Sequence, residues 1–409
     1  MNRLPFLLTA LIIGGVNASP AAEPRQFFAP PGALAQAKAR LATNDSALRP
    51  ALEALRRDAD RALKAKPVSV MDKPKPGASG DQHDYFSTAP YFWPDPSKPD
   101  GRPYLRKDGQ RNPESGNEHS DSPRLGRTGN NAITLALAYH FTGKETYAEH
   151  AAKLLRVFFL DPATRMNPNF NQAQAIPGVN DGRGIGMIES RSLTSVADAA
   201  ELLRGSKHWP SADAEAMSAW LNAFLDWALT SKNGRDERAA KNNHGMFYDE
   251  QVAHLALSCG RTNLAREIIA SATTNRLAAQ IKPDGSQPLE LARADSFGYS
   301  RFNLLAMFDL ATLGEHVGVD LWHFETKDGA GLRKALNFLL PYIEQPDKPW
   351  PYERGKKQKR VLDARILRQA FAVYHDPRYR AALQKISDAA KQRDALFFSV
   401  PYPPHANPN

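Results

Sequence analysis

Cysteine is nearly absent from this chain of 409 residues, because Cys259 is the only one. A single cysteine excludes any disulfide within the chain, so the fold is not that of a disulfide-stapled secreted domain. Long apolar runs are also missing beyond the first 21 residues, which argues against a membrane-spanning helix. The core must therefore be held by ordinary side-chain packing in water.

Several familiar motifs are missing as well. There is no His-Glu-x-x-His pair, phosphate-binding loop, Gly-x-Ser-x-Gly turn or cysteine–histidine cluster, so no metal site or common nucleotide-binding class is indicated. The glycine-rich run 182–186 lacks the spacing of a dinucleotide fingerprint and is typical of a loop. The richest Lys/Arg run, 354–360, is typical of a solvated loop, so nucleic acid is not the expected partner.

The composition is that of a folded protein with a basic surplus. Apolar residues make up 42% of the chain and charged residues 24%, which predicts a packed core. Lys plus Arg outnumber Asp plus Glu by 53 to 44, a formal net charge of +9. Such a surplus suits a polyanionic partner: nucleic acid, an anionic membrane or an acidic polysaccharide.

The N-terminus has the pattern of an export signal. Arg3 provides a short basic region, an apolar run covers 6–16, and small residues near Ala18 suit cleavage. We therefore predict a signal peptide at 1–21 and a periplasmic or secreted location in a bacterium. The remainder, 22–409, is expected to form one domain, large enough to be stable without disulfides.

An irregular segment interrupts an otherwise helical pattern. Residues 67–131 are rich in Pro, Gly, Asp and aromatics and show little periodicity, and a loop this long is usually functional. We expect it to form a lid or a subsite wall. Its aromatic residues Tyr85, Tyr91 and Trp93 can stack on sugar rings, or they can fold back as a hydrophobic plug.

Apolar residues recur at helical spacing through most of the chain. One or two helices are expected within 30–66, and more at 132–142, 147–160, 185–203, 212–230, 245–258, 262–281, 296–313, 331–343, 361–374 and 378–393. Strand alternation is scarce, and no repeat of fixed period occurs. The pattern predicts an all-α fold, a single (α/α) toroid or incomplete barrel of helical hairpins.

Two stretches carry candidate chemistry. In the first, Asn242, Asn243 and His244 stand just before a predicted helix, where backbone N–H groups favour an anion. They form either a carboxylate-binding site with a base or an ordinary helix cap with a surface histidine. In the second, Arg293 and Tyr299 lie six residues apart. Both can face one cleft, or they can be a surface cation and a helix-packing aromatic.

Together these side chains suit β-elimination from a uronic acid. Asn and Arg can neutralise the C5 carboxylate, which makes the C5 proton acidic. Tyr and His can then remove that proton and protonate the departing O4. This chemistry requires neither a metal nor an organic cofactor.

The combination of Asn243-His244, the run 289–293, Tyr299 and the run 302–304 resembles the alginate lyase superfamily of α/α-toroid polysaccharide lyases. The loop 85–96, the step 112–114 and the run 188–191 look closest to polysaccharide lyase family thirty-eight, which includes mannuronan and glucuronan lyases. The resemblance implies an acidic polysaccharide substrate bound in a groove or tunnel, and covers most of the chain from about 85 to 308.

By the same resemblance, Asn243 neutralises the carboxylate, with Asn242 as an alternative, and Tyr299 is the acid and also the base. His244 is a base or a charge-stabilising partner, and Arg293 assists, although it stands one residue closer to the tyrosine than in other alginate lyases. Glu189 and Arg191 are expected to bind substrate, or to form a buried ion pair. For a substrate with the C5 proton and O4 on one face, we expect His244 to hold the phenolate of Tyr299.

Two other functions fit parts of the pattern. An inverting glycoside hydrolase on a helical toroid would need two carboxylates across a cleft, and Asp249, Glu250 and Glu290 are available. An inactive periplasmic polysaccharide-binding protein would need no catalytic group. The intact trio of Asn243, His244 and Tyr299 argues against the binding protein, and the absorbance of an unsaturated product would separate the lyase from the hydrolase.

Overall fold

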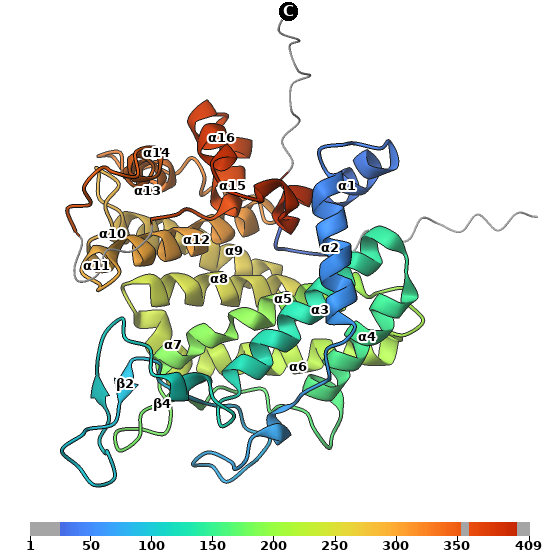
Figure 1. Ribbon diagram of the computed structural model, residues 1–409, viewed down its shortest axis with the longest axis vertical. Coiled ribbons are helices and arrows are strands. Elements are labelled where there is room, and N and C mark those ends of the chain that lie inside the picture. The colour runs from blue at the N-terminus through green and yellow to red at the C-terminus, as the bar shows by residue number, and fades with distance from the viewer. Residues whose placement is uncertain (1–24, 353–359, 399–409) are drawn as a thin grey trace, which may run out of the picture.

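The computed structural model describes residues 25–352 and 360–398. The predicted signal peptide and most of the Lys/Arg run 354–360 lie outside the described residues. The described chain is mainly helical and forms the expected (α/α) toroid (Figure 1). Its longer helices are α1 (Ala33–Ala42), α2 (Arg49–Ala62), α3 (Ser122–Thr142), α4 (Glu145–Leu155), α5 (Arg191–Leu202), α6 (Ser211–Thr230), α7 (Lys232–Ala239), α8 (Asn243–Ser258), α9 (Thr262–Ala272), α12 (Ser296–Glu315), α13 (Leu332–Leu339), α15 (Ala364–Tyr374) and α16 (Pro377–Gln384).

Shorter elements complete the described fold. They include helices α10 (Ala278–Gln280), α11 (Pro288–Leu291) and α14 (Pro341–Glu344), the 3-10 turns η4 (Gly184–Ser190) and η7 (Arg393–Leu396), and strands β1 (Phe86–Thr88), β2 (Phe92–Trp93), β3 (Leu105–Arg106) and β4 (Gln172–Ala175). Strand β1 pairs with β4 in parallel, and β2 pairs with β3 in an antiparallel hairpin. In the described residues, no helix is long and apolar enough to cross a membrane.

Helix α8 is the centre of the toroid. It packs against α12 and α9 on one side and α5, α6 and α7 on others (Figure 1). Because neighbours surround it, nearly every side chain on it is buried, including Met246, Val252 and Leu255. A helix buried on all sides needs no amphipathic stripe, and this one buries polar side chains such as Asp249 and Glu250 together with its apolar ones. Its N-terminus therefore has a fixed position.

Several helix boundaries differ from those that the sequence predicts. Helix α3 begins at Ser122, ten residues before the expected start, although glycines and asparagines at 126–131 suggested a loop. Packing of α3 against α5 overrides that weak local preference. Residues 185–190 form a 3-10 turn rather than the start of a helix, and α16 ends at Gln384, well short of the expected 393.

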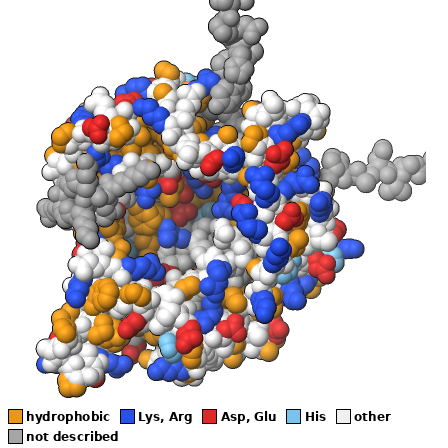
Figure 2. All heavy atoms as spheres, viewed as in Figure 1, with side chains coloured by type: hydrophobic (Ala, Val, Ile, Leu, Met, Phe, Trp, Pro, Cys, Tyr) orange, Lys and Arg blue, Asp and Glu red, His pale blue; other side chains and the backbone are white. Residues whose placement is uncertain are grey.

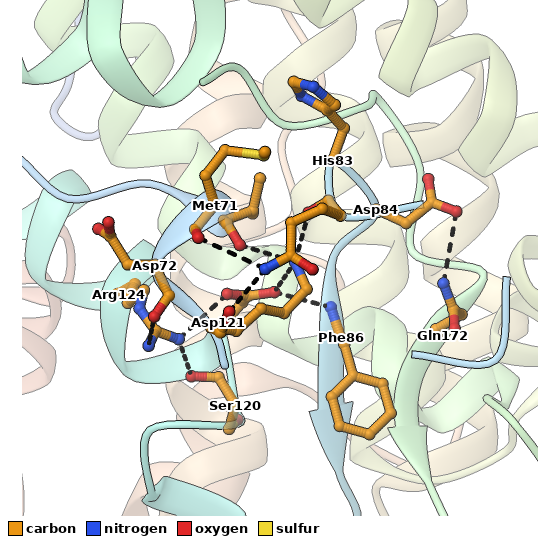
Figure 3. Close-up of polar contacts among 12 residues, drawn as sticks. Met71, Asp72, His83, Asp84, Phe86, Ser120, Asp121, Arg124 and Gln172 are labelled. Carbon is orange, nitrogen blue, oxygen red and sulfur yellow. Dashed lines mark hydrogen bonds and ion pairs between the residues drawn. The ribbon is translucent and has the colours of Figure 1, made fainter. Parts of the chain in front are cut away.

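The irregular segment is anchored to the helical body by a buried ion pair. The Lys73 ammonium contacts an Asp121 carboxylate oxygen at 3.1 Å, and both side chains are fully buried. The same carboxylate accepts a hydrogen bond from the Phe86 amide at 3.0 Å, at the start of β1. Arg124 adds bonds to the Ser120 carbonyl and the Asp121 carboxylate (Figure 3). These contacts therefore fix the irregular segment to the helical body at a point just before α3 begins.

Candidate active site

The turn that begins α8 is tightly constructed. Asn242 is the N-cap residue, and its Oδ1 accepts a hydrogen bond from the His244 amide at 3.3 Å. A Cβ on residue 245 would lie 2.1 Å from the Ala240 carbonyl oxygen and 2.5 Å from Nη1 of Arg276, so only glycine fits there. The Asn-Asn-His-Gly order thus fixes the directions of the side chains. Asn242, expected as a substrate contact, serves as the cap.

Asn243 is held from two sides by Glu290. Its backbone amide donates to Glu290 Oε1 at 2.7 Å, and its side-chain Nδ2 donates to Oε2 at 2.8 Å. The helix N-terminus therefore already has a carboxylate from the protein itself, a favourable site for negative charge. Burial raises the pKa of Glu290, and these two hydrogen bonds oppose that rise. The second hydrogen on Nδ2 has no described partner.

His244 has an acidic partner that sequence reasoning missed. Its Nδ1 lies 2.7 Å from Oε1 of Glu237, whose side chain is 1% exposed. Glu237 belongs to α7, a helix the apolar pattern did not predict. A carboxylate at Nδ1 favours the tautomer, or the cation, that carries a proton there. In the neutral ring this leaves Nε2 as the group that can accept a proton.

Tyr299 is surrounded by Tyr91 and Arg293. The Tyr299 hydroxyl donates to the Tyr91 hydroxyl at 2.9 Å, and the Arg293 guanidinium carbon lies 3.7 Å from the centre of the Tyr299 ring. Burial and the hydrogen bond to Tyr91 raise the pKa of Tyr299 well above its ordinary value, while the charge of Arg293 opposes the rise. The sequence predicts that His244 holds the phenolate of Tyr299, whereas the described contacts of Tyr299 are with Tyr91 and Arg293.

Arg293 is oriented by a residue of the irregular segment. Asp108 accepts from Nη2 at 2.8 Å and from Nε at 3.2 Å, a two-point ion pair. The hydrogen bond from Arg293 lowers the pKa of Asp108, so this carboxylate stays charged. Glu290 connects the two sequence stretches. Its carboxylate is close enough to Arg293 and His244 for their charges to lower its pKa.

The remaining predicted contacts lie around this cluster in different environments. Tyr85 is 0% exposed, stacks on Phe170 and donates to Glu189 Oε2 at 2.7 Å, so its ring faces the core. This is the plug arrangement. Trp93 lies in the β2–β3 hairpin, and its Nε1 donates to the Gln110 carbonyl at 2.9 Å. Of the three predicted aromatic residues, Tyr91 is the one whose described hydrogen bond is to Tyr299.

Glu189 and Arg191 do not pair with each other in the described structure. The Glu189 carboxylate accepts from Tyr85 and, at 2.6 Å, from Ser87, and burial raises its pKa. The exposed Arg191 lies instead over two aromatic rings, with its guanidinium carbon 5.0 Å from the centre of Phe302. Because Phe302 follows Tyr299 by one helical turn on α12, Arg191 faces the region of the site.

The face shown in Figure 2 is hollowed near its middle, with Lys and Arg side chains along the rim. A cavity of about 1510 Å³ is lined by Leu305 of α12, but Asn243, His244, Arg293 and Tyr299 are not among its lining residues. Its charged lining residues are the cations Arg61, Arg360, Arg365, Lys385, Lys391 and Arg393 and the acids Asp58, Asp363, Asp388 and Asp394. Some of these cations form ion pairs with acids of the same lining, as Arg61 does with Asp58 and Lys391 with Asp388.

A family model for alginate lyases matches residues 69–350. This chain belongs to the alginate lyase family. A crystal structure of an alginate lyase from Bacteroides ovatus is 42% identical, with a TM-score of 0.87, and the match covers 93% of this chain and 100% of that one. No curated protein matches. The protein is accordingly a polysaccharide lyase.

Two more distant structures show the same fold. Alginate lyase A1-III from Sphingomonas species A1 is 16% identical with a TM-score of 0.52, over 85% of this chain and 95% of that one. A variant of A1-III complexed with a tetrasaccharide is also 16% identical, with a TM-score of 0.55 over the same shares. These likenesses support the toroid predicted from the helical pattern.

The carboxylates considered for a hydrolase have other partners in this lyase. Asp249 forms a buried two-point ion pair with Arg276, at 2.7 and 3.0 Å. Glu290 holds Asn243. Glu250 lies in a buried cluster with Asp309 and His254. None of the three is presented as one of a facing acid–base pair, in agreement with membership of a lyase family.

Proposed function

We propose that this lyase cleaves a β-1,4-linked uronan, alginate or a related polymer such as glucuronan, by β-elimination in the periplasm or outside the cell. The observation that carries the proposal is the environment of Tyr299: its hydroxyl lies 2.9 Å from that of Tyr91, and the Arg293 guanidinium lies over its ring. The loop 85–96 and the step 112–114 support a place in polysaccharide lyase family thirty-eight.

The residues divide the reaction among them. Asn243, through its free Nδ2 hydrogen, binds the C5 carboxylate together with His244 and lowers the barrier to loss of the C5 proton. The phenolate of Tyr299, stabilised by Arg293, takes that proton. The electron pair forms the C4=C5 bond as the C4–O4 bond breaks, and Tyr299 returns the proton to O4. Tyr91 sets the protonation state of Tyr299 through their hydrogen bond.

This arrangement favours mannuronate or glucuronate residues. In both sugars the C5 proton and O4 lie on one face of the ring, so a single tyrosine can serve both steps. In guluronate they lie on opposite faces, which would require a second group as base. His244, with its Nε2 free, is then the base.

The test is ultraviolet absorbance of the unsaturated product, with mature protein incubated separately with polymannuronate, polyguluronate and glucuronan. We expect a rise on polymannuronate or glucuronan, and a loss of at least about a thousand-fold in Tyr299→Phe. A rise only on polyguluronate would move the base to His244. Flat traces with new reducing ends would indicate hydrolysis, and near-normal turnover by Tyr299→Phe would contradict the assignment.

A further inference from the structure

Arg183 is a half-buried cation that the proposed chemistry does not use. Its described hydrogen bond runs from Nη2 to Oε1 of Gln174, at 2.8 Å, and its Nε is buried without a partner in the described residues. Among those residues no carboxylate forms a salt bridge with it. Burial lowers the pKa of Arg183 to about 10, so it remains charged at neutral pH. A desolvated cation without an ion pair is costly, and such a group calls for a functional reason.

Arg183 lies near both halves of the catalytic cluster. On one side its guanidinium carbon is 5.1 Å from the centre of the Phe92 ring, and Phe92 follows Tyr91, the partner of Tyr299. On the other side it is attracted by the carboxylate of Glu237, the partner of His244.

The backbone around Arg183 is built to hold it there. A Cβ on Gly184 would lie 2.7 Å from Cβ of Asp236, so the chain passes directly against α7. Gln174 adopts φ 50, a conformation rare outside glycine, while its side chain accepts the Arg183 bond. Backbone strain of this kind is retained where the surroundings require it, commonly at functional sites.

We propose that Arg183 binds the carboxylate of a uronate residue next to the one that undergoes elimination. A guanidinium with free N–H groups matches a carboxylate in shape and charge. The inference rests on the proposed function and adds to it a requirement for a second acidic sugar in the bound chain. Arg183 then contributes to binding the polymer rather than to the proton transfers.

The experiment compares wild type, Arg183→Gln and Arg183→Lys, with Arg57→Gln as a matched loss of charge from the exposed face of α2. We expect KM for the polyuronate to rise about ten- to a hundred-fold in Arg183→Gln, with kcat within about three-fold. The KM of Arg183→Lys should lie between those of wild type and Arg183→Gln, and the KM of Arg57→Gln should equal that of wild type. A fall in kcat at unchanged KM would overturn the proposal and make Arg183 a brace for Phe92.

Calorimetric titration with acidic oligouronates separates this inference from the proposed function. If wild type binds the oligouronate and Arg183→Gln binds it more weakly, the role of Arg183 is supported even when no turnover is seen. Absence of turnover by wild type contradicts only the proposed β-elimination. If Arg183→Gln does not fold, Arg183→Lys decides: weaker binding than wild type, at an unchanged Tm, supports the proposal, and equal binding overturns it. No binding by wild type would overturn both.

Discussion

At the scale of single residues, each proposed catalytic side chain is held by a second side chain. Glu290 holds Asn243, Glu237 holds His244, and Asp108 holds Arg293. Such partners fix the orientation and protonation of a reacting group, because a buried carboxylate determines where the proton of its neighbour sits. The chemistry therefore depends on residues that touch no substrate.

We predict that Glu237→Gln lowers kcat about ten- to a hundred-fold and leaves KM within about three-fold, because His244 loses the charge that fixes its proton on Nδ1. Nitrogen NMR of the His244 ring should show a mixture of tautomers in the variant and one tautomer in wild type. Glu53→Gln, at an exposed position on α2, is the control. An unchanged kcat together with an unchanged NMR spectrum would show that Glu237 does not position His244.

The pH dependence of the reaction should report on Tyr299. Its pKa is raised above the ordinary value of 10.0, and the base must be deprotonated, so kcat/KM should still be rising at pH 10. Tyr91→Phe removes the hydroxyl that accepts the Tyr299 proton, which lowers that pKa. We predict that the alkaline limb moves to lower pH by about one unit. A limb that stays in place would contradict a role for Tyr91 in setting the protonation of Tyr299.

At the scale of elements, the irregular segment joins the site through two fixed points. Lys73 and Asp121 fasten it next to β1 and α3, and Asp108 reaches across to Arg293. Between these points, the β2–β3 hairpin presents Tyr91 to Tyr299. The segment is thus a wall of the site whose position depends on a buried ion pair.

Replacing Lys73 by Met should destabilise this wall. Removing Lys73 from this buried ion pair leaves Arg124, 3.2 Å from Asp121, as the remaining cation described beside that carboxylate. The loss should cost up to about 3–5 kcal/mol. We expect the Tm of Lys73→Met to fall by about 5 °C or more. Lys75→Met, at an exposed position two residues away, should stay within about 1 °C of wild type. Equal Tm values for the two variants would show that the Lys73 pair does not anchor the segment.

At the scale of the whole molecule, the interior of the toroid has an unusual concentration of charge. Glu250 is buried beside Asp309, His254, Arg365 and Arg191, and burial raises its pKa to about 7. An acid with a raised pKa binds its proton more tightly in the folded state. Its contribution to stability is therefore present below the unfolded value of about 4.5 and is lost as pH rises through about 7.

Glu250→Gln should remove that dependence, because the amide never ionises. We predict a Tm about 2 °C or more above wild type at pH 8, and no gain at pH 5. Thermal unfolding followed by circular dichroism at both values measures the difference, with Glu53→Gln as the control. A gain that is equal at the two pH values would show that Glu250 does not titrate in this range.

The sequence alone predicted the helical fold from its apolar periodicity, and the polysaccharide lyase class from the resemblance of its Asn-His and Arg–Tyr stretches to alginate lyases. The roles of Asn243, His244, Arg293 and Tyr299 stay predictions. It missed the early start of α3 and the whole of α7, where polar, glycine-containing sequence forms helix through packing against neighbours. The partners Glu237, Asp108 and Arg183 could not be found from spacing. Asp108 meets Arg293 across 185 residues, which only the packing of the toroid decides. Glu237 is seven residues from His244, but it reaches the imidazole only because α7 forms and turns back against α8.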